Sequence, residues 1–173
     1  AASSDYPLRD VYKRQQLEAQ KKAEEDRRAA EAAHKKKDEE ARLAKLSQEE
    51  AEKQRKITNL VNDAEQALQR KDFPTARSNT QEALTLDGNN APAISKLAKT
   101  TYLENPKNAE GLQKTLDLTG KAISLSPGYW EPYYVQGLAE GESKQYDKAI
   151  RDLTKASELN PSNAQYLNEL ANT

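Results

Sequence analysis

The chain has 173 residues, 32% of them charged and 35% hydrophobic, with a formal net charge of −1. Neither half has the one-sided basic balance that nucleic-acid or anionic-membrane binding requires, and no apolar run approaches the ~20 residues of a membrane span. Cysteine is absent and histidine occurs once, so we expect no disulfide, no catalytic thiol and no zinc–thiolate site.

The first fifteen residues differ from the rest of the chain. Asp10 to Gln15 read Asp-Val-Tyr-Lys-Arg-Gln. One permitted back-translation, GAT GTG TAT AAG AGA CAG, resembles the end of a transposon that is used to prepare sequencing libraries. The chain begins with Ala1 and contains no Met. We therefore interpret residues 1–15 as a translated adapter or, alternatively, a disordered tail, and expect the natural N-terminus to be missing.

Residues 16–56 form a charged segment with 23 charged residues in 41, no Gly, no Pro and no aromatic residue. Strong helix formers dominate it, and acid-before-base pairs recur four residues apart, which supports a helix that has no core to pack on. We predict a charged helical stalk about 60 Å long, or a solvated linker helix. A capping-box pattern at Ser47 to Glu50 could restart the helix. Large apolar residues are too few for a strong coiled coil. The predicted pairs are Glu18/Lys22, Glu24/Arg28, Glu31/Lys35, Asp38/Arg42, Glu49/Lys53 and Glu52/Lys56.

From Ile57 onward the pattern changes to helix–turn–helix units, and residues 130–163 form the clearest of them. Its distinctive residues are Gly137, Tyr146, Ala149, Leu153, Ala156 and Pro161. At these positions the unit resembles the tetratricopeptide repeat, whose period is 34 residues. Small residues are expected where helices touch, Tyr146 and Leu153 should fill gaps, and Pro161 should stop the second helix.

Sliding the same template along the chain finds a second unit at 57–90 and a degenerate one at 91–129. The unit at 57–90 carries the signature residues Ala64, Phe73, Ala76 and Ala83. The degenerate unit has 39 residues, and we expect its five extra residues in the turn between its helices, around Glu104 to Asn108. Residues 164–173 should begin a further hairpin, so the repeats span 57–173 and look truncated.

The resemblance implies an all-α fold of antiparallel helical hairpins, an α-solenoid, preceded by the charged helix. It also implies a concave face made by the first helix of each hairpin, which would be mildly apolar with tyrosines. The expected groove residues are Tyr102, Tyr134, Lys99, Glu131 and Leu138. Both tyrosines, like Trp130, could instead serve packing between repeats. The family's carboxylate clamp is rejected, because Val61, Glu65, Tyr134 and Leu138 stand where that clamp has Lys and Asn.

The sequence therefore favours a non-enzymatic, bacterial protein-interaction scaffold with a helical spacer and protein or peptide partners. We expect no cofactor, no nucleic acid and no membrane contact by this segment. One alternative is an accessory periplasmic or extracytoplasmic segment of a membrane-anchored signalling protein or enzyme whose catalytic domain is missing. A second alternative is a self-associating assembly protein. The sequence does not choose between bacterial cytoplasm and periplasm.

Overall fold

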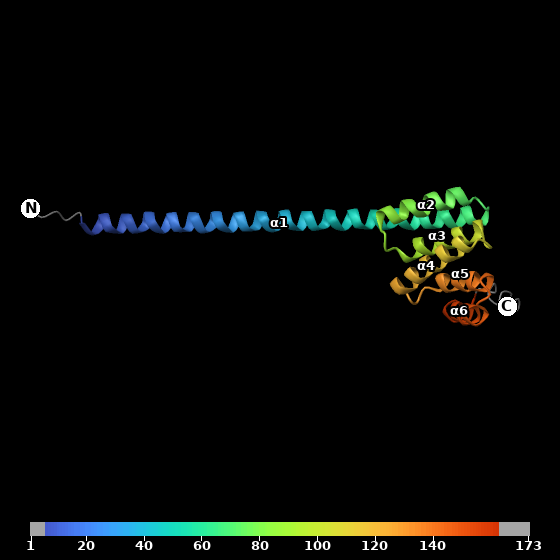
Figure 1. Ribbon diagram of the computed structural model, residues 1–173. Coiled ribbons are helices and arrows are strands. Elements are labelled where there is room, and N and C mark those ends of the chain that lie inside the picture. The colour runs from blue at the N-terminus through green and yellow to red at the C-terminus, as the bar shows by residue number, and fades with distance from the viewer. Residues whose placement is uncertain (1–5, 163–173) are drawn as a thin grey trace, which may run out of the picture. The chain divides into compact units, whose positions relative to one another are not determined.

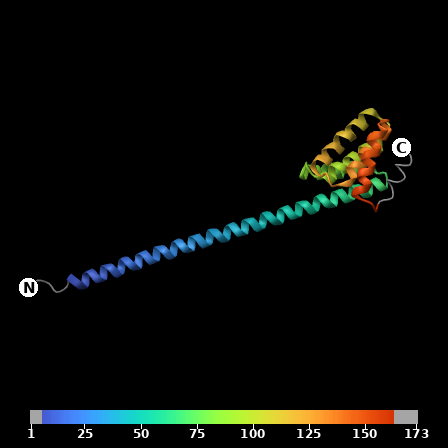
Figure 2. The same ribbon diagram turned by 90° about the horizontal axis from the view of Figure 1, so that it is seen from below.

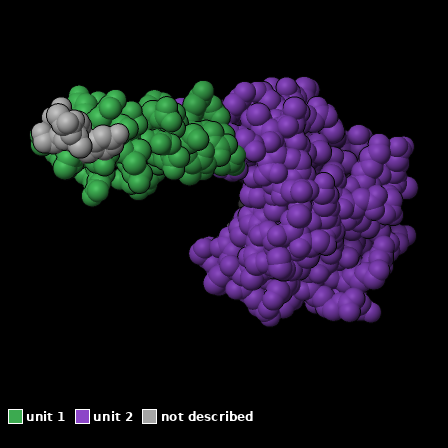
Figure 3. Space-filling model, turned by 90° about the vertical axis from the view of Figure 1, so that its left-hand side faces the viewer, with its two compact units in different colours: residues 1–51 green, residues 52–173 purple. Residues whose placement is uncertain are grey.

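The computed structural model describes residues 6–162, and over this range it contains six helices and no strand (Figure 1). The all-α fold predicted from the sequence is confirmed. The chain divides into two compact units, residues 1–51 and 52–173, which Figure 3 colours separately. Within residues 6–162, no helix combines the length and the apolar character that crossing a membrane requires. The predicted repeat helix at 164–173 lies outside the described residues.

Unit 1 consists, over its described residues, of the first part of helix α1 (Tyr6–Gln69). All its side chains from residue 7 to residue 51 are exposed, including Leu8 and Tyr12. The helix begins earlier than residue 16, where the sequence predicted an artefactual or disordered leader. A restart at Ser47 is wrong, because helix formers on both sides keep the helix continuous. The adapter origin of residues 1–15 stays a prediction.

Ion pairs along unit 1 follow the expected spacing but not always the expected partners. Glu24 and Arg28 pair at 2.6 Å, as predicted. Arg42 instead bonds Glu39 one turn back at 2.5 Å, which corrects the predicted pair with Asp38. Asp38 lies 2.8 Å from His34. These side chains are exposed, so each pair contributes only a few tenths of a kcal/mol, and the helix is stabilised by many weak local interactions.

Unit 2 is a stack of three helical hairpins that follow one another in chain order (Figures 1 and 2). Consecutive helices from α2 onward pack against each other, and α3 also packs against α5. The first buried residue along the described chain is Ile57, where the composition changes. The helices of unit 2 are the last part of α1, α2 (Phe73–Leu86), α3 (Ala91–Glu104), α4 (Ala109–Leu125), α5 (Trp130–Glu142) and α6 (Tyr146–Leu159).

Short polar side chains determine where three of these helices begin. The side chains of Asp72, Asn90 and Asn108 each accept a hydrogen bond from the backbone N–H three residues on, at 3.2, 3.0 and 2.8 Å. Each bond satisfies one of the donors that a helix leaves free at its start. Lys71 and Lys144 occupy the matching place in two of the hairpin turns, and both have a positive φ, 59° and 61°. The turns therefore repeat in geometry as well as in length.

The 39-residue unit accommodates its five extra residues differently from the sequence prediction. The turn between α3 and α4 is residues 105–108, only one residue longer than the turns at 70–72 and 143–145. Helix α4 has 17 residues against 14 in α6, and α3 has 14 against 13 in α5. Most of the insertion therefore extends α4 by about one turn, because a helix satisfies its own backbone groups and a longer loop does not.

The small signature residues lie where helices touch. Ala64, Ala76, Ala83, Ala149 and Ala156 are at most 1% exposed. At Gly137 a Cβ atom would lie 2.8 Å from Leu153 Cγ, so α5 and α6 approach too closely for any larger residue. Leu153 itself is buried, as expected. Helix α6 ends at Leu159, two residues before Pro161.

The two aromatic signature residues do not behave alike. Phe73 packs partly buried against Ala67, Leu68 and Ala76. Tyr146, at the matching position, is 49% exposed and does not fill the hairpin, which corrects the prediction. Both residues begin the second helix of their hairpin.

Candidate interaction site

A hollow of about 480 Å³ opens in unit 2 between α1, α3 and α5, the first helices of the three hairpins. Its size lies within the range of ligand pockets. The lining combines four charged side chains with three apolar ones and an amide. These residues are Glu65, Leu68, Gln69, Lys96, Lys99, Leu103, Trp130 and Glu131.

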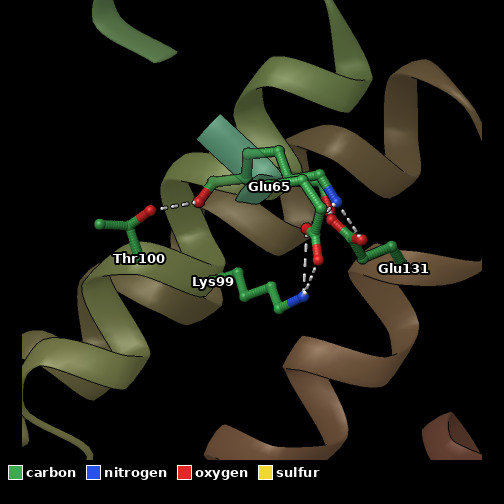
Figure 4. Close-up of polar contacts among 6 residues, drawn as sticks. Glu65, Lys99, Thr100 and Glu131 are labelled. Atoms are coloured by element: carbon green, nitrogen blue, oxygen red, sulfur yellow. Dashed lines mark hydrogen bonds and ion pairs between the residues drawn. The ribbon is translucent and has the colours of Figure 1, made fainter. Parts of the chain in front are cut away.

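The four charged side chains that line the hollow form an ion network, whose contacts are drawn in Figure 4. Lys96 Nζ donates to Glu65 Oε2 at 2.6 Å and to Glu131 Oε2 at 2.5 Å, so one residue of α3 joins α1 to α5. Ser95 Oγ donates to the other Glu131 oxygen at 3.0 Å. Lys96 is 7% exposed and Glu131 2%, and removing either partner would leave an uncompensated buried charge.

Lys99 is held more loosely than Lys96. Its Nζ lies 3.3 Å from both oxygens of Glu65, at the long end of hydrogen-bonding distance. The Lys99 side chain is 21% exposed and that of Glu65 30%, against 9% for Lys96. The Glu65–Lys99 pair therefore forms the accessible edge of the network, and the Lys96–Glu131 pair forms its buried part.

Opposite charges keep the network ionised despite its burial. Burial alone would lower the pKa of Lys96, but the Glu131 and Glu65 carboxylates outweigh it and raise that pKa above its ordinary value. Burial alone would raise the pKa of Glu65, but hydrogen bonding and attraction from Lys96, together with Lys99, lower it. Both directions favour the charged forms of Lys96 and Glu65 around pH 7.

An adjoining hollow of about 330 Å³ shares Glu65 and Lys96 with the first. Tyr129 and Val61 are among the side chains that line it. Burial, together with the nearby Glu131 carboxylate, raises the pKa of Tyr129, so its hydroxyl is a donor at neutral pH. We call the two hollows together the recess; residues of α1 and α3 line both, and Trp130 and Glu131 of α5 line the first.

The structure separates the five predicted groove residues into two groups. Lys99 and Glu131 line the larger hollow. Tyr102 lies in the core with Ala98, Leu112, Val135 and Ala139, and Tyr134 and Leu138 pack partly buried against that cluster. Neither predicted tyrosine lines the larger hollow, where two Lys and two Glu side chains lie beside the apolar ones. Contact of any of the five residues with a peptide stays a prediction.

Sequence reasoning missed Lys96 and left open whether Trp130 packs between repeats or contacts a ligand. Lys96 lies on the same helix as Lys99 and Tyr102, but not at a repeat position that was expected to face the groove. Its partners Glu65 and Glu131 are 31 and 35 residues away, about one repeat in each direction. An acidic, a basic and an acidic residue, each about one repeat apart, could have predicted an ion network between the first helices of the hairpins. Trp130 lines the hollow, and its ring centroid lies 6.2 Å from that of Tyr134 and 6.5 Å from that of Tyr129.

No protein-family model and no curated protein matches the chain. Among solved structures, the first TPR domain of human RPAP3 is similar at 19% identity, over 67% of this chain and 87% of that one, with a TM-score of 0.57. The first TPR of Spaghetti (RPAP3), bound to the HSP90 peptide SRMEEVD, is similar at 18% identity, over 68% and 92%, with a TM-score of 0.58.

A bacterial enzyme also contains a similar structure. The O-GlcNAc transferase of Thermobaculum terrenum, in its K341M mutant, is 22% identical over 68% of this chain, with a TM-score of 0.59. The match covers only 22% of the transferase chain. The fold of this chain is therefore that of tetratricopeptide-repeat (TPR) domains, as the resemblance in its sequence predicted.

Proposed function

We propose that the chain is a protein-interaction scaffold in which unit 2 binds a peptide or an extended protein segment and unit 1 serves as a helical spacer. The observation that carries this proposal is the recess along α1, α3 and α5, with its accessible Glu65–Lys99 pair and the side chain of Trp130. A similar TPR structure carries a bound peptide, which supports a peptide-sized occupant. The proposed role is binding, not catalysis.

Trp130 provides a direct test, because it is the only tryptophan of the chain and lies in the hollow. Peptides selected from a random library on the immobilised whole chain should change the fluorescence of Trp130 on titration. The saturation curve should weaken in Leu103→Ala, which shortens a side chain of the hollow. Leu125→Ala is the matched control, because Leu125 is 43% exposed on α4 against 37% for Leu103 on α3. Failure to select any peptide would refute the proposal.

Two finer hypotheses stay predictions. Membership in a larger membrane-anchored protein predicts further domains in the full-length gene. Self-association predicts that the sedimentation coefficient rises with concentration. A constant monomeric coefficient would exclude the second.

A further inference from the structure

The four charges of the larger hollow neutralise one another, which limits what can bind there. Lys96 contacts two carboxylates, and both oxygens of Glu131 are engaged, one by Lys96 and one by Ser95. A carboxylate entering the hollow would meet no unpaired cation and would approach Glu65 and Glu131. An entering cation would meet Lys96 and Lys99 in the same way. The charge balance therefore favours an uncharged occupant, because a charged one loses hydration without gaining an unpaired counter-charge.

The Glu65–Lys99 pair offers a donor and an acceptor side by side. Two bonds of 3.3 Å to one carboxylate use the Lys99 ammonium only weakly, and it has three hydrogens to donate. Glu65 Oε1 accepts only one of these long bonds, whereas Oε2 also accepts the short bond from Lys96. A residue in extended conformation presents its backbone N–H and C=O on the same side, so it can donate to Glu65 and accept from Lys99 without breaking the buried part of the network.

Apolar side chains lie in the same hollow as this pair. Leu68 and Leu103 come from α1 and α3, and Trp130 is the first residue of α5. The rings of Tyr129 and Tyr134 pack beside the indole, so an occupant of the hollow meets an aromatic cluster. Rigid aromatic surfaces bind at low cost in side-chain entropy.

We propose that the larger hollow recognises an uncharged, extended segment of a partner protein through one large apolar side chain and the backbone of a neighbouring residue. The apolar side chain rests against Trp130, Leu68 and Leu103, and the backbone N–H and C=O of the neighbouring residue bond Glu65 and Lys99. This inference rests on the proposed peptide-binding function and specifies its ligand. It separates this chain from the similar TPR structure whose bound peptide, SRMEEVD, is acidic.

The test compares two random peptide libraries on the immobilised whole chain, one displayed with free C-terminal carboxylates and one with the same segments embedded in a longer chain. We expect binders from the embedded library, near zero net charge and enriched in large apolar residues. A synthetic binder with acetylated and amidated ends should retain its affinity. Its Kd should change by less than about threefold between low and high salt, because no net charge is neutralised on binding.

A variant of the chain tests the hydrogen bond that Lys99 donates to the bound segment. Lys99→Met keeps the length of the side chain and removes its donor, and should raise the Kd about two- to tenfold, the effect of one lost hydrogen bond. Lys155→Met removes an exposed lysine of α6 and should leave the Kd unchanged. Circular dichroism of each variant checks that it is folded.

Each other outcome overturns the inference in a recognisable way. Acidic or basic binders, a requirement for the free carboxylate, or a tenfold loss of affinity in high salt would show recognition of charge, and the proposed peptide-binding function would stand. If uncharged peptides bound with the same Kd to the Lys99→Met variant, the contact between Lys99 and the peptide backbone would be disproved. If neither library gave a binder, both the inference and the proposed function would fail.

Discussion

Replacing Glu140 by Gln should stabilise the protein in a pH-dependent way. Glu140 is 6% exposed in α5, and its Oε2 has no hydrogen-bond partner within the described part of the chain. Burial, with a hydrogen bond to Asp152 of α6 and the charge of that residue, raises the pKa of Glu140 to about 8, and Lys148 and Arg151 oppose the shift. Asp152 also accepts from Gln136 Nε2 at 2.8 Å.

The sign of the effect follows from where the proton is bound. The reference pKa is 4.5, so from there to about pH 8 native Glu140 keeps a proton that the unfolded chain has released. Stability is therefore highest below pH 4.5 and falls by about 1.4 kcal/mol per pH unit until pH 8. Between pH 4.5 and pH 7 this slope corresponds to a loss of about 3 kcal/mol. Screening by solvent at the edge of the hairpin reduces it, and we expect about 1 to 3 kcal/mol.

Glu140→Gln removes this loss, because an amide stays neutral and can donate to the Asp152 carboxylate. Urea denaturation followed by circular dichroism at pH 5, 7 and 9 should show a gain in stability that grows with pH. Glu142→Gln on the same helix is the control, because Glu142 is exposed. If Glu140→Gln and the original chain had the same free energy of unfolding at pH 9, the raised pKa of Glu140 beside Asp152 would be refuted.

Three further substitutions test the packing of unit 2. Ala149→Leu should overpack the α5–α6 contact and lower the free energy of unfolding by about 1–3 kcal/mol; an unchanged melting temperature would show that the repeat register is wrong. Lys144→Gly should stabilise the turn by about 1 kcal/mol, because glycine adopts the positive φ without strain; a loss in urea denaturation would contradict this. Lys96→Met should lower the free energy of unfolding by about 3–5 kcal/mol, because it leaves Glu131 buried without its counter-charge. The double variant Lys96→Met/Glu131→Gln should recover part of that loss. Equal stability of the two variants would disprove the coupling between Lys96 and Glu131.

The sequence specified the hairpins because repeat spacing alone determines where helices must touch. Gly137, Ala149 and Ala156 could be assigned to contacts from their spacing, and their burial confirms it. The extended α4 could not be placed in this way. Thr115, Thr119 and Ala122 of α4 are buried, but repeat spacing does not say whether extra residues join a turn or a helix.

The recess was harder to predict because its chemistry depends on pairs far apart in sequence. Lys99 and Glu131 were chosen from repeat positions, and both line the hollow. Tyr102 was chosen from a repeat position in the same way, and also for its chemistry, yet it packs in the core. Propensity and periodicity describe one helix at a time, whereas Lys96 acquires its role from carboxylates on two other helices.

The most direct test of the central claim is hydrogen–deuterium exchange of the whole chain with and without a selected peptide. Segments that carry the hollow's lining, around residues 65–69, 96–103 and 130–131, should exchange more slowly in the complex. Exchange in α2 and α6 away from the recess should change little. Protection confined to α2, α4 or α6 would place binding on another face and contradict the account.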